Sequence, residues 1–223
     1  MLKPEAIRPK RRKRHGDDVR EEGLAAARAL LLAGGPGEVT LAKIGKAIGM
    51  SHANVLHHFG SAAQLQAALM GSMINDLTAA LDNVVTLLKS DAAAPRTITD
   101  LVFDAFDEGG AGHLAAWIIL SGEVQHLEPV REAVRSLVQA IAGDSQDDQG
   151  KEQIRSAVMM MAIAAFGDAL IGPYAREMLD RKDDAMRDLF ARILPLFLIP
   201  SGIPPALPTV SPAFNQALNQ PSA

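Results

Sequence analysis

The sequence predicts an all-α protein, and three observations support this fold class. Apolar residues recur three and four positions apart along most of the chain, which is the spacing of one face of a helix. Ser, Thr, Gly and Pro, which cap or interrupt helices, separate these stretches. No stretch has the sustained alternation of apolar and polar residues that indicates a half-buried strand.

A basic arm and a first helix are expected at the N-terminus. Residues 1–15, MLKPEAIRPKRRKRH, contain seven basic residues and two prolines and are expected to be disordered. Asp17 or Asp18 can serve as the N-cap of the helix that follows, and GGPG at 34–37 ends it.

Two short helices follow, separated by a tight turn. Thr40 is a suitable N-cap for the first, Gly49 can adopt the left-handed conformation that ends it, and Ser51 can cap the second. In the second, Val55 and Phe59 are four residues apart and must both point to the core. Its remaining polar side chains therefore face elsewhere: His52, Asn54, His57 and His58. This pattern is typical of a helix-turn-helix, whose second helix lies in the major groove of DNA.

A long helix and five further helices account for most of the remaining chain. Ser61 can cap the long fourth helix, whose apolar stripe runs from Leu65 to Leu88 and whose length suits a connection between two parts of the molecule. The others are expected at about 97–108, 113–121, 129–142, 150–172 and 183–198. The segment 200–223 is rich in proline, carries no charge and is expected to be disordered.

Composition and charge narrow the function. The chain has no cysteine, which excludes disulfides and thiolate chemistry and is consistent with the cytoplasm. Its longest apolar run, at 157–167, is shorter than the ~20 residues of a membrane span, so no membrane is expected. Residues 1–60 contain 11 Lys and Arg against 6 Asp and Glu, a net +5, whereas residues 61–223 contain 11 against 20, a net −9. A basic first segment indicates contact with a polyanion.

Residues 18–77 resemble the DNA-binding domain of the tetracycline-repressor (TetR) family. The resemblance rests on the segment VTLAKIGKAIGMSHANVLHHFGSAAQL, in which Thr40, Ile44, Ile48, Gly49 and the pair His58-Phe59 fall at the family's spacing. The rest of the chain is similar to the family only in being helical and of the usual length.

The resemblance implies a cytoplasmic, ligand-responsive repressor that binds a palindromic double-stranded operator as a homodimer. The implied domains are the arm at 1–15, a DNA-binding domain at 16–77 with the helix-turn-helix at about 39–58, a ligand-binding and dimerisation domain at 78–199, and the tail at 200–223. In the family the last two long helices form the dimer interface, here about 150–172 and 183–198. An unidentified small molecule would tilt the fourth helix and change the spacing of the two recognition helices. No cofactor, metal or catalytic residue is expected.

The same resemblance assigns roles to side chains. Thr40 would contact a phosphate at the start of its helix, where the helix dipole also attracts an anion. Asn54 could pair with adenine, and Ala53 could contact a thymine methyl group. His57 and His58 would lie against the DNA backbone. The expected DNA contacts are Thr40, Lys43, Ser51, His52, Ala53, Asn54, Leu56, His57, His58, Arg11, Arg12, Lys13 and Arg14.

Three positions depart from the family pattern. Leu56 stands where a tyrosine usually bonds phosphate, and Gly60 and Ala62 stand where lysines are common. We infer that the basic arm replaces these contacts, since flexible arginine-rich arms enter the minor groove in other proteins. The arm could instead be only a solvated tail.

A ligand pocket is expected in the C-terminal part of the chain. Phe103 and Phe106 share a helix face, as do His113 and Trp117, and methionines suit an adaptable wall. Each of these could equally be ordinary core. The candidate pocket residues are Phe103, Phe106, His113, Trp117, Glu123 and Met160.

Alternative functions remain open. The three-helix unit could be only structural, or its histidines could bind zinc, although the neighbouring His57 and His58 diverge by about 100° and no HExxH partner is present. An architectural DNA binder without ligand response would lack an apolar cavity in the 100–180 region. A helical small-molecule binding protein or enzyme would turn the SHANVLHH face inward, but no phosphate loop, nucleophile elbow or paired carboxylates support catalysis.

Overall fold

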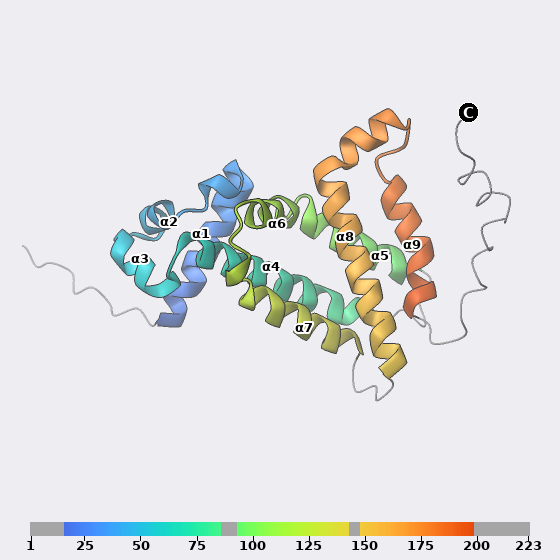
Figure 1. Cartoon of the computed structure of the whole chain (residues 1–223), viewed down its shortest axis with the longest axis horizontal. Helices are drawn as coiled ribbons and strands as arrows, with labels where there is room; N and C mark the ends of the chain where they lie inside the picture. The colour runs from blue at the N-terminus through green and yellow to red at the C-terminus, as the bar shows by residue number, and fades with distance from the viewer. Residues whose placement is uncertain (1–15, 86–92, 143–147, 199–223) are drawn as a thin grey trace, which may run out of the picture.

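The computed structural model describes residues 16–85, 93–142 and 148–198, and throughout these ranges the regular structure is helical (Figure 1). The predicted all-α fold class is therefore confirmed. The arm at 1–15 and the tail at 200–223 lie outside the described residues.

The N-terminal end of the molecule is a compact group of short helices packed on the start of a long one (Figure 1). Leu31, Ile44 and Val55 lie in its hydrophobic core. The elements of this group are α1 (Gly16–Gly34), the 3₁₀ helix η1 (Pro36–Glu38), α2 (Leu41–Ile48), α3 (His52–Phe59) and α4 (Ala62–Val85).

The C-terminal end is a bundle in which α7 lies along α4 and the pair α8–α9 stands at the end farthest from α1–α3 (Figure 1). Its own core includes Phe103, Leu137 and Phe190. Its elements are α5 (Ala94–Phe106), α6 (Ala111–Leu120), the 3₁₀ helix η3 (Val124–His126), α7 (Glu128–Ala142), α8 (Asp148–Met178) and α9 (Ala185–Leu198).

Two helices connect the ends of the molecule. Helix α4 contributes Leu69 and Met73 to the N-terminal core and Leu81 to the C-terminal core. Helix α6 lies late in the chain, yet its Leu114 and Ile118 belong to the N-terminal core. The boundary expected between residues 77 and 78 thus falls inside a continuous helix, and it stays a prediction.

Two helix ends differ from the sequence prediction. Helix α1 begins at Gly16, so Asp17 and Asp18 lie in its first turn and do not cap it; their negative charge still favours the positive end of the helix dipole. Helix α8 continues through Pro173 to Met178 and does not end at residue 172. A proline removes only one intrahelical hydrogen bond, and an ion pair between Asp168 and Arg176 joins the turns on either side of it.

Helix α8 is long and apolar enough to cross a membrane by length and composition alone. In the structure it packs against α5, α6, α7 and α9. The ion pair between Asp168 and Arg176 lies along it, with both side chains largely buried. These contacts are those of a helix in a bundle, so the composition by itself is weak evidence for a membrane.

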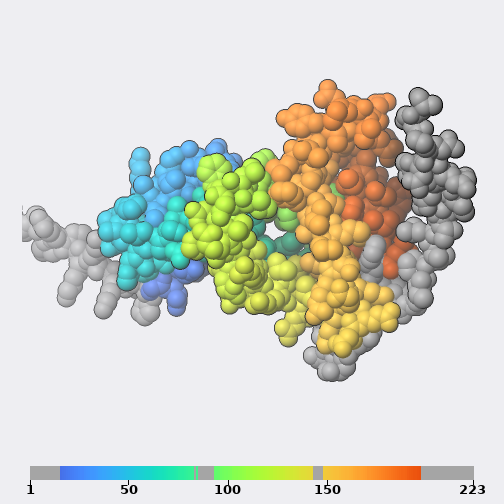
Figure 2. Space-filling model, in the orientation of Figure 1, coloured from blue at the N-terminus to red at the C-terminus, as the bar shows by residue number. Residues whose placement is uncertain are grey.

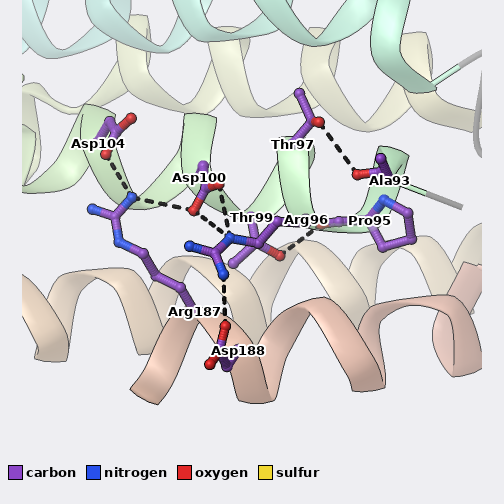
Figure 3. Close-up of polar contacts among 9 residues, drawn as sticks. All are labelled: Ala93, Pro95, Arg96, Thr97, Thr99, Asp100, Asp104, Arg187 and Asp188. Atoms are coloured by element: carbon purple, nitrogen blue, oxygen red, sulfur yellow. Dashed lines mark hydrogen bonds and ion pairs between the residues drawn. The ribbon is translucent and has the colours of Figure 1, made fainter. Parts of the chain in front are cut away.

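A chain of ion pairs joins α5 to α9 (Figure 3). Arg187 on α9 donates to Asp104 at 2.6 Å and to Asp100 at 3.4 Å, and its guanidinium lies 5.6 Å from the centre of the buried Phe103 ring. Burial opposes the charge of Arg187, but the hydrogen bonds and attraction of the two aspartates outweigh it and raise its pKa.

Arg96 completes the same network from α5. Its Nε donates to Asp100 at 2.8 Å, and its Nη1 donates to Asp188 on α9 at 2.6 Å (Figure 3). The hydrogen bond to Asp100 is the main reason that the pKa of Arg96 is raised. Both arginines therefore remain charged and hold the two helices together.

Candidate nucleic-acid interface

Helix α2 begins at Leu41 because Thr40 caps it. The backbone of Thr40 is extended, and its side-chain oxygen accepts a hydrogen bond from the Lys43 amide at 3.3 Å. A hydroxyl group can accept one hydrogen bond and donate another. Thr40 can therefore cap α2 and also donate to a phosphate placed at the start of this helix, where unpaired amides favour an anion.

The turn between α2 and α3 is fixed by two glycines. Gly49 ends α2 in the left-handed conformation with φ 68°, which favours glycine. The Met50 amide then donates to the Gly45 carbonyl at 2.7 Å. A Cβ atom on Gly45 would lie 2.7 Å from the Met50 carbonyl oxygen, so only glycine lets the turn approach α2 this closely. The sequence analysis identified Gly49 but not Gly45.

Helix α3 is anchored by two side chains and exposes the rest. Ser51 caps it by accepting a hydrogen bond from the Asn54 amide at 3.3 Å. Val55 and Phe59 are buried, which confirms the prediction that both point to the core. The exposed side chains are Ser51, His52, Ala53, Asn54, Leu56 and His57, and His58 is half-buried.

Helix α1 holds the C-terminal end of α3. Arg20 donates to the His58 carbonyl at 3.2 Å, and its guanidinium lies 5.3 Å from the centre of the Phe59 ring. Beside it, a Cβ atom on Gly23 would lie 2.6 Å from the Phe59 ring, so a glycine allows this aromatic side chain to reach α1. The contact of Arg20 with α3 was not predicted from the sequence. The one feature that could have indicated it is the position of Arg20 three residues before Gly23, on the same helix.

The lysines of α2 differ in their surroundings. Lys43, an expected phosphate contact, forms an ion pair with Glu38 of η1. A phosphate contact would therefore require Lys43 to exchange this partner. Lys46 is also exposed on α2 and lies three residues further along, which puts it near Lys43 on the helix surface. The sequence analysis missed Lys46, although this spacing was the available signal.

Other expected features of the interface remain predictions or gain no support. Arg11, Arg12, Lys13 and Arg14 lie outside the described residues, so their contacts with DNA stay predictions. The described part of the chain has no group of three metal-binding side chains. His57 and His58 are side by side, with ring centres 5.6 Å apart, but a zinc site needs further ligands.

Two apolar cavities adjoin each other along α4, one beside the C-terminal core and one beside the N-terminal core. One has a volume of about 120 Å³ and is lined by side chains of α4, α5, α7, α8 and α9. The other has a volume of about 270 Å³ and lies closer to α1 and α6. Ile74, Leu77, Phe106 and Val134 line both. The surface is also hollowed between α6 and α8 (Figure 2).

The expected pocket residues do not gather at these cavities. Of the six, Phe106 lines both cavities. Phe103 is fully buried against Phe190, with ring centres 5.8 Å apart. The other four lie elsewhere: His113 and Trp117 are exposed on α6, Glu123 contacts Gln125, and Met160 packs against the C-terminal core.

Helix packing explains this difference. Helix α6 turns Leu114 and Ile118 toward the N-terminal core, so His113 and Trp117, one position before each, face away from it. The cavities are lined by aliphatic residues such as Leu77, which the sequence cannot distinguish from ordinary core.

The capped pair α2–α3, with its exposed polar helix, has the geometry of a helix-turn-helix within an all-α protein. Residues 24–69 match the family model described as bacterial regulatory proteins, tetR family. The match covers the helix-turn-helix and parts of the helices on either side of it.

Two comparisons with known proteins agree with this family. The chain is 32% identical over 119 residues to the HTH-type transcriptional regulator BetI of Rhizobium meliloti (strain 1021). This match covers 52% of the chain and 57% of the relative, so it spans little more than half of that curated protein. The fold is similar, with a TM-score of 0.53 and 18% identity, to a solved structure described as a TetR-family transcriptional regulator from Mesorhizobium loti MAFF303099. That likeness covers 83% of this chain and 98% of the other.

Proposed function

We propose that the chain is a cytoplasmic transcription regulator, a ligand-responsive repressor that binds a palindromic DNA operator as a homodimer. The observation that carries this proposal is the exposed face of α3. Its two apolar anchors, Val55 and Phe59, are buried, while the polar residues from Ser51 to Asn54 face solvent. A rigid helix that exposes hydrogen-bonding groups at its N-terminal end suits the major groove.

The exposed residues divide into two kinds of contact. Asn54 can hydrogen-bond the edge of adenine, and Ala53 can contact the methyl group of thymine. Thr40 and the exposed His57 are placed for phosphates, which fix the position of the protein but carry no sequence information. Sequence recognition is therefore assigned to the start of α3 and anchoring to the residues around it.

An apolar surface on α8 and α9 supports the homodimer. Obligate interfaces bury about 2,000 Å² or more and resemble a core cut in half, and exposed apolar side chains on two long helices are what such an interface would cover. The exposed residues of this surface are Met159, Ile163, Ile171, Tyr174, Met178, Leu179, Leu189 and Leu196. Ile154, Val158 and Met161 on α8 do not belong to this surface, because they line the smaller cavity.

The two cores suggest how a ligand would act on DNA binding. Helix α4 belongs to both cores and lines both cavities, so a molecule held in these cavities can change its tilt. Recognition helices of a dimer fit successive major grooves only about 34 Å apart. A ligand that favours another spacing lowers DNA affinity through its preference for that state.

The alternative functions receive less support. An architectural DNA binder would lack an apolar cavity, whereas two adjoin each other here. A histidine-lined enzyme pocket requires the histidines to face inward, but His52 and His57 are exposed.

Selection of DNA sequences by the purified full-length protein tests the proposal directly. The expected result is a palindrome with two half-sites separated by about one helical turn. Binding of all sequences alike would contradict a sequence-specific regulator.

The homodimer is tested by sedimentation at micromolar concentration. Ile163→Glu places a charge on the exposed surface of α8 and should give a monomer, because an unpaired charge in an apolar interface is costly. Leu120→Glu makes the same change at an exposed residue of α6 and should remain a dimer. A monomeric wild-type protein would overturn this part of the proposal.

A further inference from the structure

Among the described residues that line the two adjoining cavities, one is charged, and it comes from α1 at the N-terminal end of the molecule. The smaller cavity is lined entirely by apolar side chains. The larger is lined by apolar side chains and by Arg28 of α1. Together they reach the lower end of the ~300–1,000 Å³ range of small-molecule sites, which are mostly apolar with a few placed polar groups.

Arg28 lies where the larger cavity meets an open groove between α1 and α4. It lines the cavity with Met73 and Ile118, and it lines the groove with Glu21 and Asp76. Its side chain is 42% exposed. A molecule that fills the cavity with apolar atoms can therefore reach solvent beside this guanidinium.

The guanidinium of Arg28 has N–H donors that are available to a ligand. Its Nη1 donates to Asp76 Oδ2 at 2.5 Å, and this is the one hydrogen bond that it makes within the described residues. A guanidinium has five N–H donors in a planar fork. Carboxylates fit this fork with two parallel hydrogen bonds.

We propose that the effector is a small amphiphile with one carboxylate and a flexible apolar chain. The chain fills the two cavities, passing between Ile74, Leu77 and Phe106, and the carboxylate binds Arg28. Within the larger cavity the charged side chain is that of Arg28, which favours an anionic group there, although the adjoining groove also carries Asp17, Glu21 and Asp76. A wholly apolar ligand would leave the guanidinium paired with Asp76 and would not use its remaining N–H donors.

The position of Arg28 also gives the ligand a direct route to DNA binding, and this step rests on the proposed function. The ion pair of Arg28 with Asp76 joins α1 to α4. On the same helix, Arg20 holds the last turn of α3 through the His58 carbonyl. A carboxylate that competes with Asp76 for Arg28 therefore changes how α1, and with it α3, is held on α4.

The test measures Kd by calorimetry with the full-length protein and decanoate, at concentrations well below micelle formation. Decanoate should bind at least tenfold more tightly than 1-decanol, which has the same chain without the charge, and butyrate should not bind detectably. Arg28→Gln should weaken decanoate at least tenfold and leave 1-decanol unchanged. Asp76→Asn should retain or improve decanoate binding, because it removes the competing carboxylate.

A matched control variant distinguishes the binding of a carboxylate by Arg28 from a general effect of removing a surface ion pair. Arg131 pairs with Glu128 at 2.9 Å and is 54% exposed, but it lines neither cavity. Arg131→Gln should bind decanoate as the wild type does. The inference is overturned if decanoate does not bind, if 1-decanol binds equally well, or if Arg28→Gln keeps full affinity for decanoate.

The effect on DNA is measured separately. Decanoate should lower operator affinity at least tenfold in the wild type and much less in Arg28→Gln. Decanoate binding without any change in operator affinity overturns the coupling through α1. Failure of the DNA selection to give an operator counts against the proposed function, whereas failure of decanoate to bind counts against this inference alone.

Discussion

Asn54 of α3 and Thr40, the N-cap of α2, are proposed to contact different parts of the DNA. Asn54 is assigned to a base edge and Thr40 to a phosphate. Asn54→Ala should cost about 1–3 kcal/mol on the preferred operator and little on random DNA, because a base contact discriminates sequence. Thr40→Ala should weaken binding to both alike. Titration of each variant against both DNAs measures the difference.

Thr40 needs a control because its side chain also caps α2. Loss of an N-cap typically costs about 1 kcal/mol of stability. Binding should therefore be measured well below the melting temperature, where Thr40→Ala is still fully folded. Thr40→Ser retains the hydroxyl and should behave almost as the wild type. Equal losses of discrimination from Asn54→Ala and Thr40→Ala would show that the two roles are wrongly assigned.

A substitution at Gly45 gives a second prediction at the scale of single residues. Gly45→Ala puts a methyl group against the Met50 carbonyl, and such overpacking typically costs about 1–3 kcal/mol. Denaturant unfolding followed by circular dichroism should detect this loss of stability. Gly16→Ala is the matched control, because nothing lies within 4 Å of its Cβ position, and the expected change is within about 0.5 kcal/mol. An equally stable Gly45→Ala protein would mean that the turn can move away from α2.

At the scale of elements, the contact between α5 and α9 depends on Arg187. Arg187→Ala removes a largely buried guanidinium from two aspartates and from the face of Phe103. The expected loss is about 1–3 kcal/mol, since a partly buried network loses both hydrogen bonds and packing. Arg155→Ala removes an exposed pair with Glu152 on α8 and should cost less than about 1 kcal/mol.

The pH dependence of this loss follows from the direction of the shift. The pKa of Arg187 is raised in the folded protein above its ordinary value. The stability that this shift provides is therefore fully present at any pH below the ordinary arginine pKa, and it is lost only as the pH rises through the folded-state pKa. The difference in unfolding free energy between wild type and Arg187→Ala should therefore be the same at pH 6 and pH 9. A difference that shrinks across this range would mean that another titrating group controls the contact.

The sequence predicted elements best where a single residue decides their ends. Thr40, Gly49 and Ser51 fix α2 and α3 locally, and the structure has both helices there. The end of α8 was wrong because Pro173 indicates a break that an ion pair between distant turns overcomes. The cavity walls could not be predicted, because which face of α5 or α6 points inward depends on how the helices pack.

At the scale of the whole molecule, the basic arm should determine salt dependence. Leu56, Gly60 and Ala62 cannot supply the phosphate contacts usual in the family, so the arm must compensate if the protein binds DNA tightly. Each basic residue that neutralises a phosphate lowers log K by about 0.9 per unit of log salt. Removing residues 1–14, which carry seven positive charges, should weaken operator binding at least tenfold near physiological salt.

Two further measurements complete this prediction. The salt dependence of the truncated protein should be shallower by about two to four phosphate contacts. Its dimerisation and its preference at the positions facing Asn54 should remain, because phosphate contacts carry no base recognition. Superimposable titration curves for the full and truncated proteins would identify the arm as a solvated tail.

Helix α4 has a consequence for the dynamics of the protein. Met73 lies in one core and Leu81 in the other, and eight residues of helix separate them by only about 12 Å. Neither core can open without exposing part of the helix that the other core packs on, so the two unfold as one cooperative unit. Weakening the C-terminal core with Arg187→Ala should therefore lower the protection of α4 amides near Leu69 against hydrogen exchange.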